Sequence, residues 1–173
     1  MTFFSGFCFH NEKALFEPYL LQNDFTVAGF SYGAIKAFEY VLTCKDRIDT
    51  LQLFSPAFFQ HKDAKFKKLQ TLSFTKNRAL YTQNFMQNTT YPLGFDATPY
   101  TCQGTLEELN ELLYFEWDTA KLQALVDKGV KIEVFLGEKD AIIDSFTCKD
   151  FFVPYATVYY FKNTGHLLQS CNL

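Results

Sequence analysis

The run Gly29-Phe30-Ser31-Tyr32-Gly33 constrains the fold more than any other part of the sequence. It lies between an apolar segment typical of a buried strand and a segment whose apolar residues recur at helical spacing. A serine between two glycines at such a junction indicates a sharp strand-to-helix turn, because a Cβ at either glycine would collide where strand and helix approach closely. The sequence therefore predicts that Ser31 lies at a strained backbone corner.

Short apolar segments recur along the chain and alternate with helical ones. The expected strands are Thr2–Phe4, Phe25–Ala28, Thr50–Phe54, Lys131–Leu136 and Thr157–Phe161. The expected helices are Asn11–Gln22, Tyr32–Cys44, Ala64–Leu72, Glu107–Phe115 and Thr119–Lys128. This alternation predicts the α/β class with a mostly parallel sheet. The 173 residues suffice for a core, and we expect one domain over 1–173.

The segment from about residue 57 to 117 interrupts this alternation. It contains no evident core strand, and its part Asn88–Gly104, which holds two prolines and two glycines, is expected to be a loop. The segment is rich in aromatic residues within a chain that has 21 Phe and 10 Tyr. So many rings indicate that some line a pocket or a partner surface. We therefore expect an inserted, aromatic-rich lid over the site.

Three residues fit the chemistry of a serine nucleophile. A neutral hydroxyl such as that of Ser31 needs a base within hydrogen-bonding reach, and the base needs a carboxylate to orient it. His166 follows the last expected strand and is the best base available. Asp140 follows the strand that ends at Leu136, where parallel sheets assemble their sites. Asp144 lies four residues later and remains a competing candidate for the carboxylate.

Acyl transfer also requires donors for the oxyanion that forms on the substrate. The backbone N–H of Tyr32, directly after the serine, is the first candidate. The second is the N–H of Phe7, in the loop after the first strand, although this loop could equally be a simple turn. We find no metal-binding cluster and no glycine-rich phosphate loop, so hydrolysis without a cofactor or metal is expected.

Three motifs together resemble the α/β-hydrolases over nearly the whole chain: Gly29–Gly33, Gly137-Glu138-Lys139-Asp140 and Gly165-His166. The resemblance implies a compact α/β-hydrolase fold with a Ser-Asp-His order of the catalytic residues. The chain departs from the family because the usual first two strands are missing before Thr2. We therefore expect a reduced sheet.

More narrowly, the chain is similar to the short esterases of biotin biosynthesis that act on pimeloyl-acyl-carrier-protein methyl ester. The segment Leu53–Phe59, leading into an aromatic and lysine-rich insertion, carries this similarity. The resemblance implies a serine carboxylesterase that releases methanol, and an acyl carrier protein as partner. Phe7, Phe58 and Phe59 are the expected substrate-binding residues. The expected carrier-docking residues, which could also form a solvated face, are Lys62, Lys65, Lys67 and Lys68.

Other functions stay open at this point. The same residues would serve another carboxylesterase or an acyl-thioesterase, and a hydrolase-like protein that binds an acyl chain without catalysis is a further alternative. The net charge of −3 argues against a nucleic-acid binder. Without a recognisable signal peptide or membrane span, we expect a cytoplasmic monomer. The five scattered cysteines, Cys8, Cys44, Cys102, Cys148 and Cys171, are expected to be free thiols.

Overall fold

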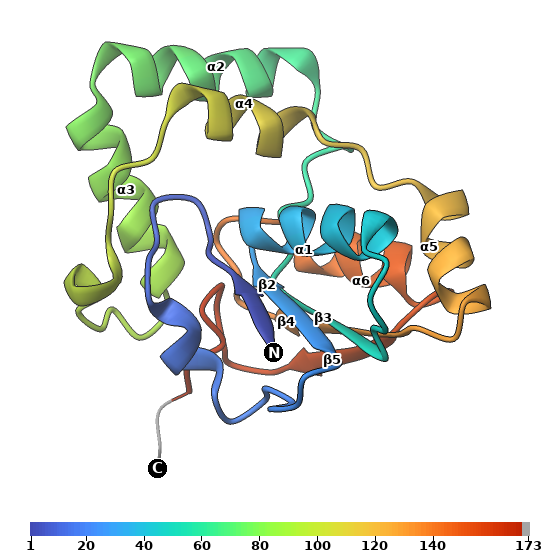
Figure 1. Ribbon diagram of the computed structural model, residues 1–173. Coiled ribbons are helices and arrows are strands. Elements are labelled where there is room, and N and C mark those ends of the chain that lie inside the picture. Colours follow the sequence, from blue (N-terminus) through green and yellow to red (C-terminus); the bar gives the residue numbers. More distant parts are fainter. Residues whose placement is uncertain (171–173) are drawn as a thin grey trace.

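A computed structural model describes residues 1–170 of the chain (Figure 1). Its sheet contains the strands β1 (Thr2–Phe4), β2 (Thr26–Phe30), β3 (Thr50–Phe54), β4 (Lys131–Gly137) and β5 (Thr157–Phe161). The strands follow one another in chain order across the sheet, and each neighbouring pair is parallel. The predicted α/β class and parallel sheet are therefore confirmed. Strand β2 extends two residues further than expected, up to the residue before Ser31.

The two faces of the sheet are covered differently. The helices α1 (Tyr32–Thr43), α5 (Thr119–Asp127) and α6 (Ser145–Phe152) contribute to the core on one face. The 3-10 helix η1 (Glu12–Phe16) and the turn around Leu167 contribute to a second apolar cluster on the other. Alternate residues of the central strands enter the two clusters, because successive side chains of a strand point to opposite faces.

Two of these elements differ from the prediction. The expected helix Asn11–Gln22 is only the 3-10 helix η1, so that prediction is wrong beyond Phe16. Asn11 has a left-handed backbone with φ of 56°, and Pro18 supplies no N–H for a helical hydrogen bond. The short helix α6 was not predicted from the sequence.

The segment between β3 and β4 carries α2 (Ala64–Lys76), α3 (Arg78–Thr90), the 3-10 helix η2 (Thr98–Tyr100), α4 (Leu106–Tyr114) and α5. We call α2, α3 and α4 the cap. Figure 1 shows α2 and α4 running side by side beyond the sheet and α3 descending beside them. Helix α3 was not predicted, and its last residues occupy the start of the expected loop Asn88–Gly104.

The cap is tied to the body of the protein at two places. At its base, the indole N–H of Trp117 donates to the carbonyl of Ala57 over 2.9 Å, so the two ends of the expected insertion meet. Near the site, Glu111 of α4 accepts hydrogen bonds from the hydroxyl of Tyr32 and the ammonium of Lys36, both on α1. These contacts fix the cap relative to the helix that begins beside Ser31.

Gly33 is required by the close approach of α1 to the chain after β1. A Cβ on this residue would lie 2.0 Å from the carbonyl oxygen of Phe4 and 2.5 Å from that of Ser5. Since both atoms belong to the backbone, Gly33→Ala is expected to lower the free energy of unfolding by about 3 kcal/mol. Urea denaturation would measure the loss.

Gly94→Ala is the control for this substitution. A Cβ on Gly94 would meet nothing within 4 Å, but φ of +64° makes any side chain there strained. We expect a cost of about 1 kcal/mol from that backbone strain alone. Equal losses in the two variants would contradict the steric explanation for Gly33.

Four of the five cysteines lie within the described residues, and the prediction of free thiols is confirmed for Cys8, Cys44, Cys102 and Cys148. Cys171 lies outside them. Burial raises the pKa of Cys8 to about 12, so its thiol stays protonated at neutral pH. Within residues 1–170, none of the helices has the length and apolar character needed to cross a membrane.

Candidate active site

Ser31 lies at the carboxyl end of β2, in the sharp turn that leads into α1. Its backbone has φ of 53° and ψ of −113°, which is unusual for a residue with a side chain. The turn is held because the N–H of Ser31 donates to Phe54 of β3 over 2.8 Å and its carbonyl accepts from Ala57 over 3.1 Å. Ser31 is 4% exposed. The predicted strained corner is therefore present.

The structure brings His166 and Asp140 together with Ser31. The imidazole Nε2 of His166 lies 3.0 Å from the hydroxyl of Ser31. Its Nδ1 lies 2.7 Å from Oδ2 of Asp140. The side chains of His166 and Asp140 are fully buried, which excludes water from their hydrogen bond. This arrangement allows His166 to accept the serine proton while Asp140 holds the imidazole in one tautomer.

The tertiary structure distinguishes Asp140 from Asp144. The second oxygen of Asp140 accepts from the N–H groups of Ile142 and Ile143, at 2.7 and 3.0 Å, so the carboxylate is held in place. Asp144 instead caps α6, where it accepts from the backbone N–H and the hydroxyl of Thr147. These hydrogen bonds lower the pKa of Asp144. Both carboxylate oxygens of Asp144 are therefore used at the start of the helix, whereas Asp140 is the carboxylate that contacts His166.

Several residues that hold His166 were not identified from the sequence. The hydroxyl of Ser55, directly after β3, donates to the carbonyl of His166 over 2.7 Å. The ring of Phe30 lies against the imidazole with 5.1 Å between centroids. A Cβ on Gly165 would lie 1.7 Å from the carbonyl oxygen of Tyr91, so the turn before His166 packs directly on the residue that follows α3. The position of Ser55 at a strand end was the one available signal.

The proposed oxyanion donors are both close to the nucleophile in the fold. Tyr32 is the first residue of α1, where a backbone N–H has no partner within the helix. Phe7 lines the same pocket as Ser31, and its N–H donates to no other protein group within residues 1–170. The role of these two amides as oxyanion donors stays a proposal.

Glu12 supports the loop that carries Phe7. Its side chain is fully buried, and Oε1 accepts from the N–H of Gly6 over 2.7 Å. Among residues 1–170, its Oε2 has no hydrogen-bond partner. Burial accordingly raises the pKa of Glu12, because a carboxylate is poorly stabilised there.

This raised pKa leads to a pH-dependent prediction. The folded protein binds the Glu12 proton more tightly than the unfolded chain, so stability is lost as pH rises from the unfolded pKa through the folded one. Glu12→Gln keeps the acceptor for Gly6 without the charge. The variant is expected to be more stable than the wild type at pH 8, and the difference should vanish below about pH 4. Urea unfolding at both pH values tests this, and a less stable variant at pH 8 would contradict it.

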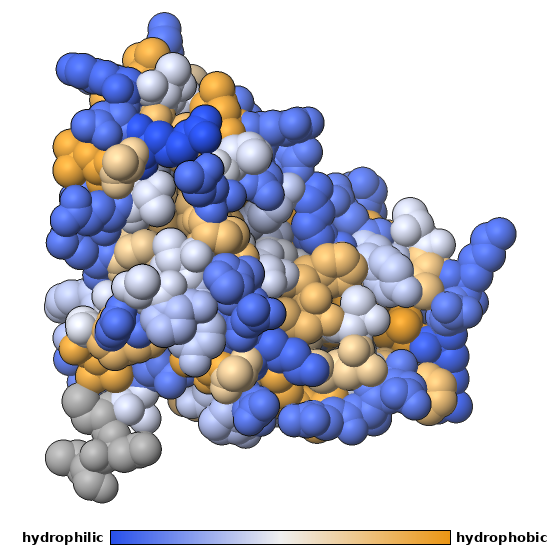
Figure 2. Space-filling model, turned by 60° about the vertical axis from the view of Figure 1, so that its left-hand side comes forward, coloured by the Kyte–Doolittle hydropathy of each residue, from blue (hydrophilic) through white to orange (hydrophobic). Residues whose placement is uncertain are grey.

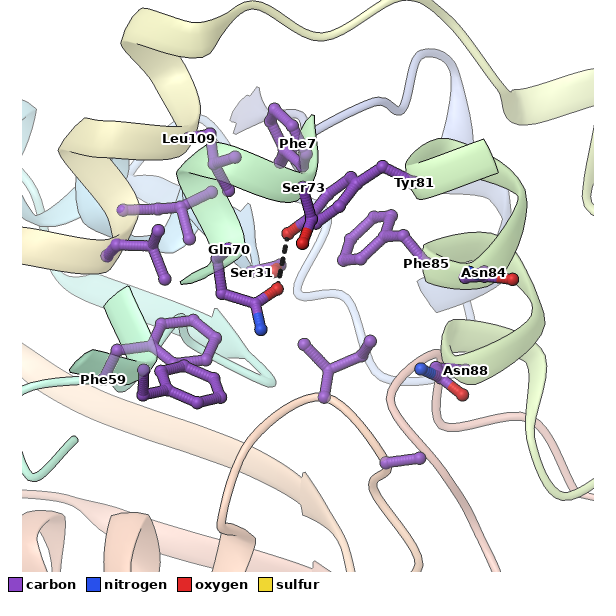
Figure 3. Close-up of a pocket in the computed structure, with 15 residues that line it drawn as sticks. Phe7, Ser31, Phe59, Gln70, Ser73, Tyr81, Asn84, Phe85, Asn88 and Leu109 are labelled. Atoms are coloured by element: carbon purple, nitrogen blue, oxygen red, sulfur yellow. Dashed lines mark hydrogen bonds between the residues drawn. The ribbon is translucent and has the colours of Figure 1, made fainter. Parts of the chain in front are cut away.

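A pocket of about 410 Å³ opens beside Ser31 (Figure 3). Its lining consists of Phe7, Ser31, Phe59, Phe66, Gln70, Ser73, Tyr81, Asn84, Phe85, Asn88, Leu109, Leu112, Leu113, Ala141 and Ile142. None of these side chains is charged. Phe7 and Phe59 both line this pocket, and their role in substrate binding stays a proposal.

Phe58 corrects the expectation of three substrate-binding phenylalanines. It lies outside this pocket, with its ring against Phe151 and Phe152 of α6. Phe59 lines the pocket beside Ser31, whereas Phe58 lines a different cavity together with His61 and Phe151. We do not retain Phe58 as a substrate-binding residue.

The four predicted docking lysines are not equivalent. Lys65 and Lys68 are exposed on α2, and Lys62 is partly exposed just before it. Lys67 is only 7% exposed, and its ammonium lies 5.2 Å from the centre of the Tyr114 ring. We therefore leave Lys67 out of the proposed docking surface. Among residues 1–170, no three potential metal ligands cluster together.

No protein-family model matches the chain, and no curated protein matches it in sequence. Its structure is similar to several solved ones. Naproxen esterase (carboxylesterase NP) from Bacillus subtilis aligns with a TM-score of 0.54 and 16% identity, over 83% of this chain and 53% of that one. The hydrolase olei00960 from Oleispira antarctica aligns with a TM-score of 0.58 and 14% identity, over 83% of this chain and 58% of that one. MenH from S. aureus aligns with a TM-score of 0.58 and 12% identity, over 95% of this chain and 85% of that one.

These similarities show that the chain has a compact α/β-hydrolase fold. The aligned part covers only 53% to 58% of the first two of these proteins, although it covers 85% of MenH. At such low identity the comparison concerns the fold and leaves the substrate undetermined.

Proposed function

We propose that the protein is a serine carboxylesterase. The observation that carries this proposal is the hydrogen-bonded series from Ser31 through His166 to Asp140 beside an uncharged pocket. Ser31 attacks the ester carbonyl while His166 takes its proton. The N–H groups of Tyr32 and Phe7 bind the oxyanion. His166 then protonates the leaving alcohol, and a water that it deprotonates hydrolyses the acyl-enzyme and regenerates Ser31.

The uncharged pocket favours a neutral ester over a free acid. A methyl ester loses little hydration on entering such a site, whereas a carboxylate would have to be desolvated without a charged partner. Hydrolysis converts the methyl ester into the carboxylate, so the pocket binds the product less well than the substrate. The pocket therefore supports an esterase whose product leaves as a carboxylate.

We further propose that the substrate is the methyl ester of pimeloyl-acyl-carrier protein, as in biotin biosynthesis. The outer face of α2 supports a carrier as partner, because Lys65, Lys68 and Lys76 flank the exposed Leu69 and Leu72 at helical spacing. Figure 2 shows hydrophobic side chains set among hydrophilic ones at the top of the molecule, where Figure 1 places the cap helices. Positive charge around an apolar centre is complementary to an acidic carrier with an apolar patch.

Methanol release from purified pimeloyl-acyl-carrier-protein methyl ester is the direct test. A panel of other methyl esters, p-nitrophenyl esters and acyl thioesters should be assayed beside it. We expect turnover of the carrier-borne methyl ester with the highest kcat/KM. Faster cleavage of thioesters would favour an acyl-thioesterase. No turnover of any ester, together with no labelling of Ser31 by a fluorophosphonate, would favour a non-catalytic acyl-binding protein.

The docking surface is tested by reversing two of its charges. The double substitution Lys65→Glu and Lys68→Glu should raise the KM for the carrier-borne substrate by about tenfold at low salt, and the effect should shrink as salt is added. Turnover of a small diester, which lacks the carrier, measures any damage to the site itself. Lys121→Glu with Lys128→Glu is the matched control, because both lysines are exposed, Lys121 within α5 and Lys128 directly after it. An equal rise in KM in the control would contradict docking on α2.

A further inference from the structure

The polar lining of the pocket is concentrated on two helices of the cap. Apart from Ser31, its polar residues are Gln70 and Ser73 of α2 and Tyr81, Asn84 and Asn88 of α3. Every other lining residue is apolar. A molecule bound at Ser31 in this pocket can therefore meet further polar side chains only on α2 and α3.

Gln70 is the member of this group whose amide is oriented by the protein. Its Oε1 accepts a hydrogen bond of 3.0 Å from the hydroxyl of Tyr81. Figure 3 shows the Gln70 side chain reaching into the pocket, with the amide nitrogen directed away from Tyr81. Within residues 1–170 this nitrogen donates to no protein group. Because the oxygen is already used, Gln70 offers a hydrogen-bond donor to whatever occupies the pocket.

Tyr81 is held firmly enough to impose this orientation. Its ring packs edge-on against Phe74, with 5.4 Å between centroids, and Phe74 is almost completely buried. Burial also raises the pKa of Tyr81 to about 12. The hydroxyl therefore keeps its proton and acts as a donor to Gln70 throughout the neutral pH range.

We propose that Gln70 is a specificity-determining residue that selects esters with a second carbonyl group across an alkyl chain. Its amide N–H donates to that distal carbonyl while the ester carbonyl lies at Ser31. This inference rests on the proposed esterase function and defines its substrate class. In a carrier-borne diacyl chain the distal group is the thioester carbonyl. An ester with only one carbonyl would displace water from the Gln70 amide without offering it a new hydrogen bond. The protein would therefore bind such an ester less tightly.

The test compares two small esters with the same chain length, dimethyl heptanedioate and methyl heptanoate. Both carry the same scissile methyl ester, and only the first has a distal carbonyl. With the wild-type protein, the kcat/KM for the diester, divided by two for its two equivalent ester groups, should be about fivefold higher than the kcat/KM for methyl heptanoate. We call this quotient the diester-to-monoester ratio. Gln70→Leu removes the amide, and Gln70→Glu keeps the shape but replaces the donor with an acceptor. In both variants the ratio should fall to about one.

Two further variants identify the source of the preference. Tyr81→Phe removes the group that orients Gln70 and should give an intermediate ratio. Gln83→Leu is the matched control, because Gln83 lies on α3 but lines a different cavity, and its ratio should equal that of the wild type. Fluorophosphonate labelling of Ser31 shows that each variant is folded and has a reactive serine.

The outcomes separate this inference from the proposed function. Hydrolysis of both esters at equal rates by the wild type would overturn the role of Gln70 and leave the esterase intact. A preference that survives in Gln70→Leu and Gln70→Glu would also overturn it. If the wild-type protein hydrolyses neither these esters nor the carrier-borne substrate, the proposed function itself fails, and the inference fails with it.

Discussion

Ser31→Ala is expected to abolish ester hydrolysis while the protein stays folded. The substitution removes the hydroxyl that lies 3.0 Å from His166 Nε2, so no acyl-enzyme can form. For a site of this kind we expect kcat to fall by at least about 10⁴-fold. The strained turn itself depends on backbone hydrogen bonds to Phe54 and Ala57, which the variant keeps. Its thermal unfolding midpoint should therefore remain within a few degrees of the wild type, at about 1 kcal/mol of lost stability.

Methanol release measures this loss, with circular dichroism and thermal unfolding to verify the fold. The fluorophosphonate should label the wild-type protein at Ser31 and leave the variant unlabelled. Turnover by a folded Ser31→Ala protein at more than a few per cent of the wild-type rate would exclude Ser31 as the nucleophile.

Asp140→Asn should reduce kcat by about 10⁴-fold with little change in structure. The amide oxygen of asparagine can still accept from the N–H groups of Ile142 and Ile143. Its NH₂ would then face Nδ1 of His166 as a donor, which favours the tautomer that carries its proton on Nε2. Because Nε2 already carries a proton, His166 cannot accept the hydroxyl proton of Ser31. The variant therefore has no general base, although all three side chains remain in place.

Asp144→Asn is the matched control, because it makes the same chemical change four residues away. Asp144 caps α6, and asparagine is also a good helix cap, so the cost should stay below about 1 kcal/mol of stability. Its kcat should stay within about twofold of the wild type. The reverse pattern, with activity lost in Asp144→Asn and kept in Asp140→Asn, would assign the carboxylate to Asp144.

Most of the sheet could be predicted from local patterns in the sequence. The central strands are short and buried on both faces, so continuous apolar runs between helical segments identify them. Helix α4 was also predicted to within one residue at each end, and the structure shows a capping box of Thr105 and Glu108 at its start. Helix α3 was missed because its many polar residues show little helical periodicity.

The contacts that orient the site were less accessible from the sequence. Nothing local shows that Ser55 donates to the carbonyl of His166, or that Tyr81 of one cap helix orients Gln70 of another. The burial of Lys67 against Tyr114 is equally long-range. Such contacts join residues that are distant in the sequence, and each depends on how complete helices pack against one another.

The sequence by itself determined the strained turn at Ser31, because the glycines that permit the turn lie two residues before and two residues after it in the chain, and the requirement for Gly29 arises from the backbone of Gly33 in the same turn. It also determined the order of serine, acid and histidine at the strand ends. Only the tertiary structure decided between Asp140 and Asp144, and between Phe59 and Phe58, as the residues that face the site. Both candidates in each pair have similar chemistry and nearly the same position in the chain. The direction of a side chain is set by the packing around it, which the sequence pattern does not record.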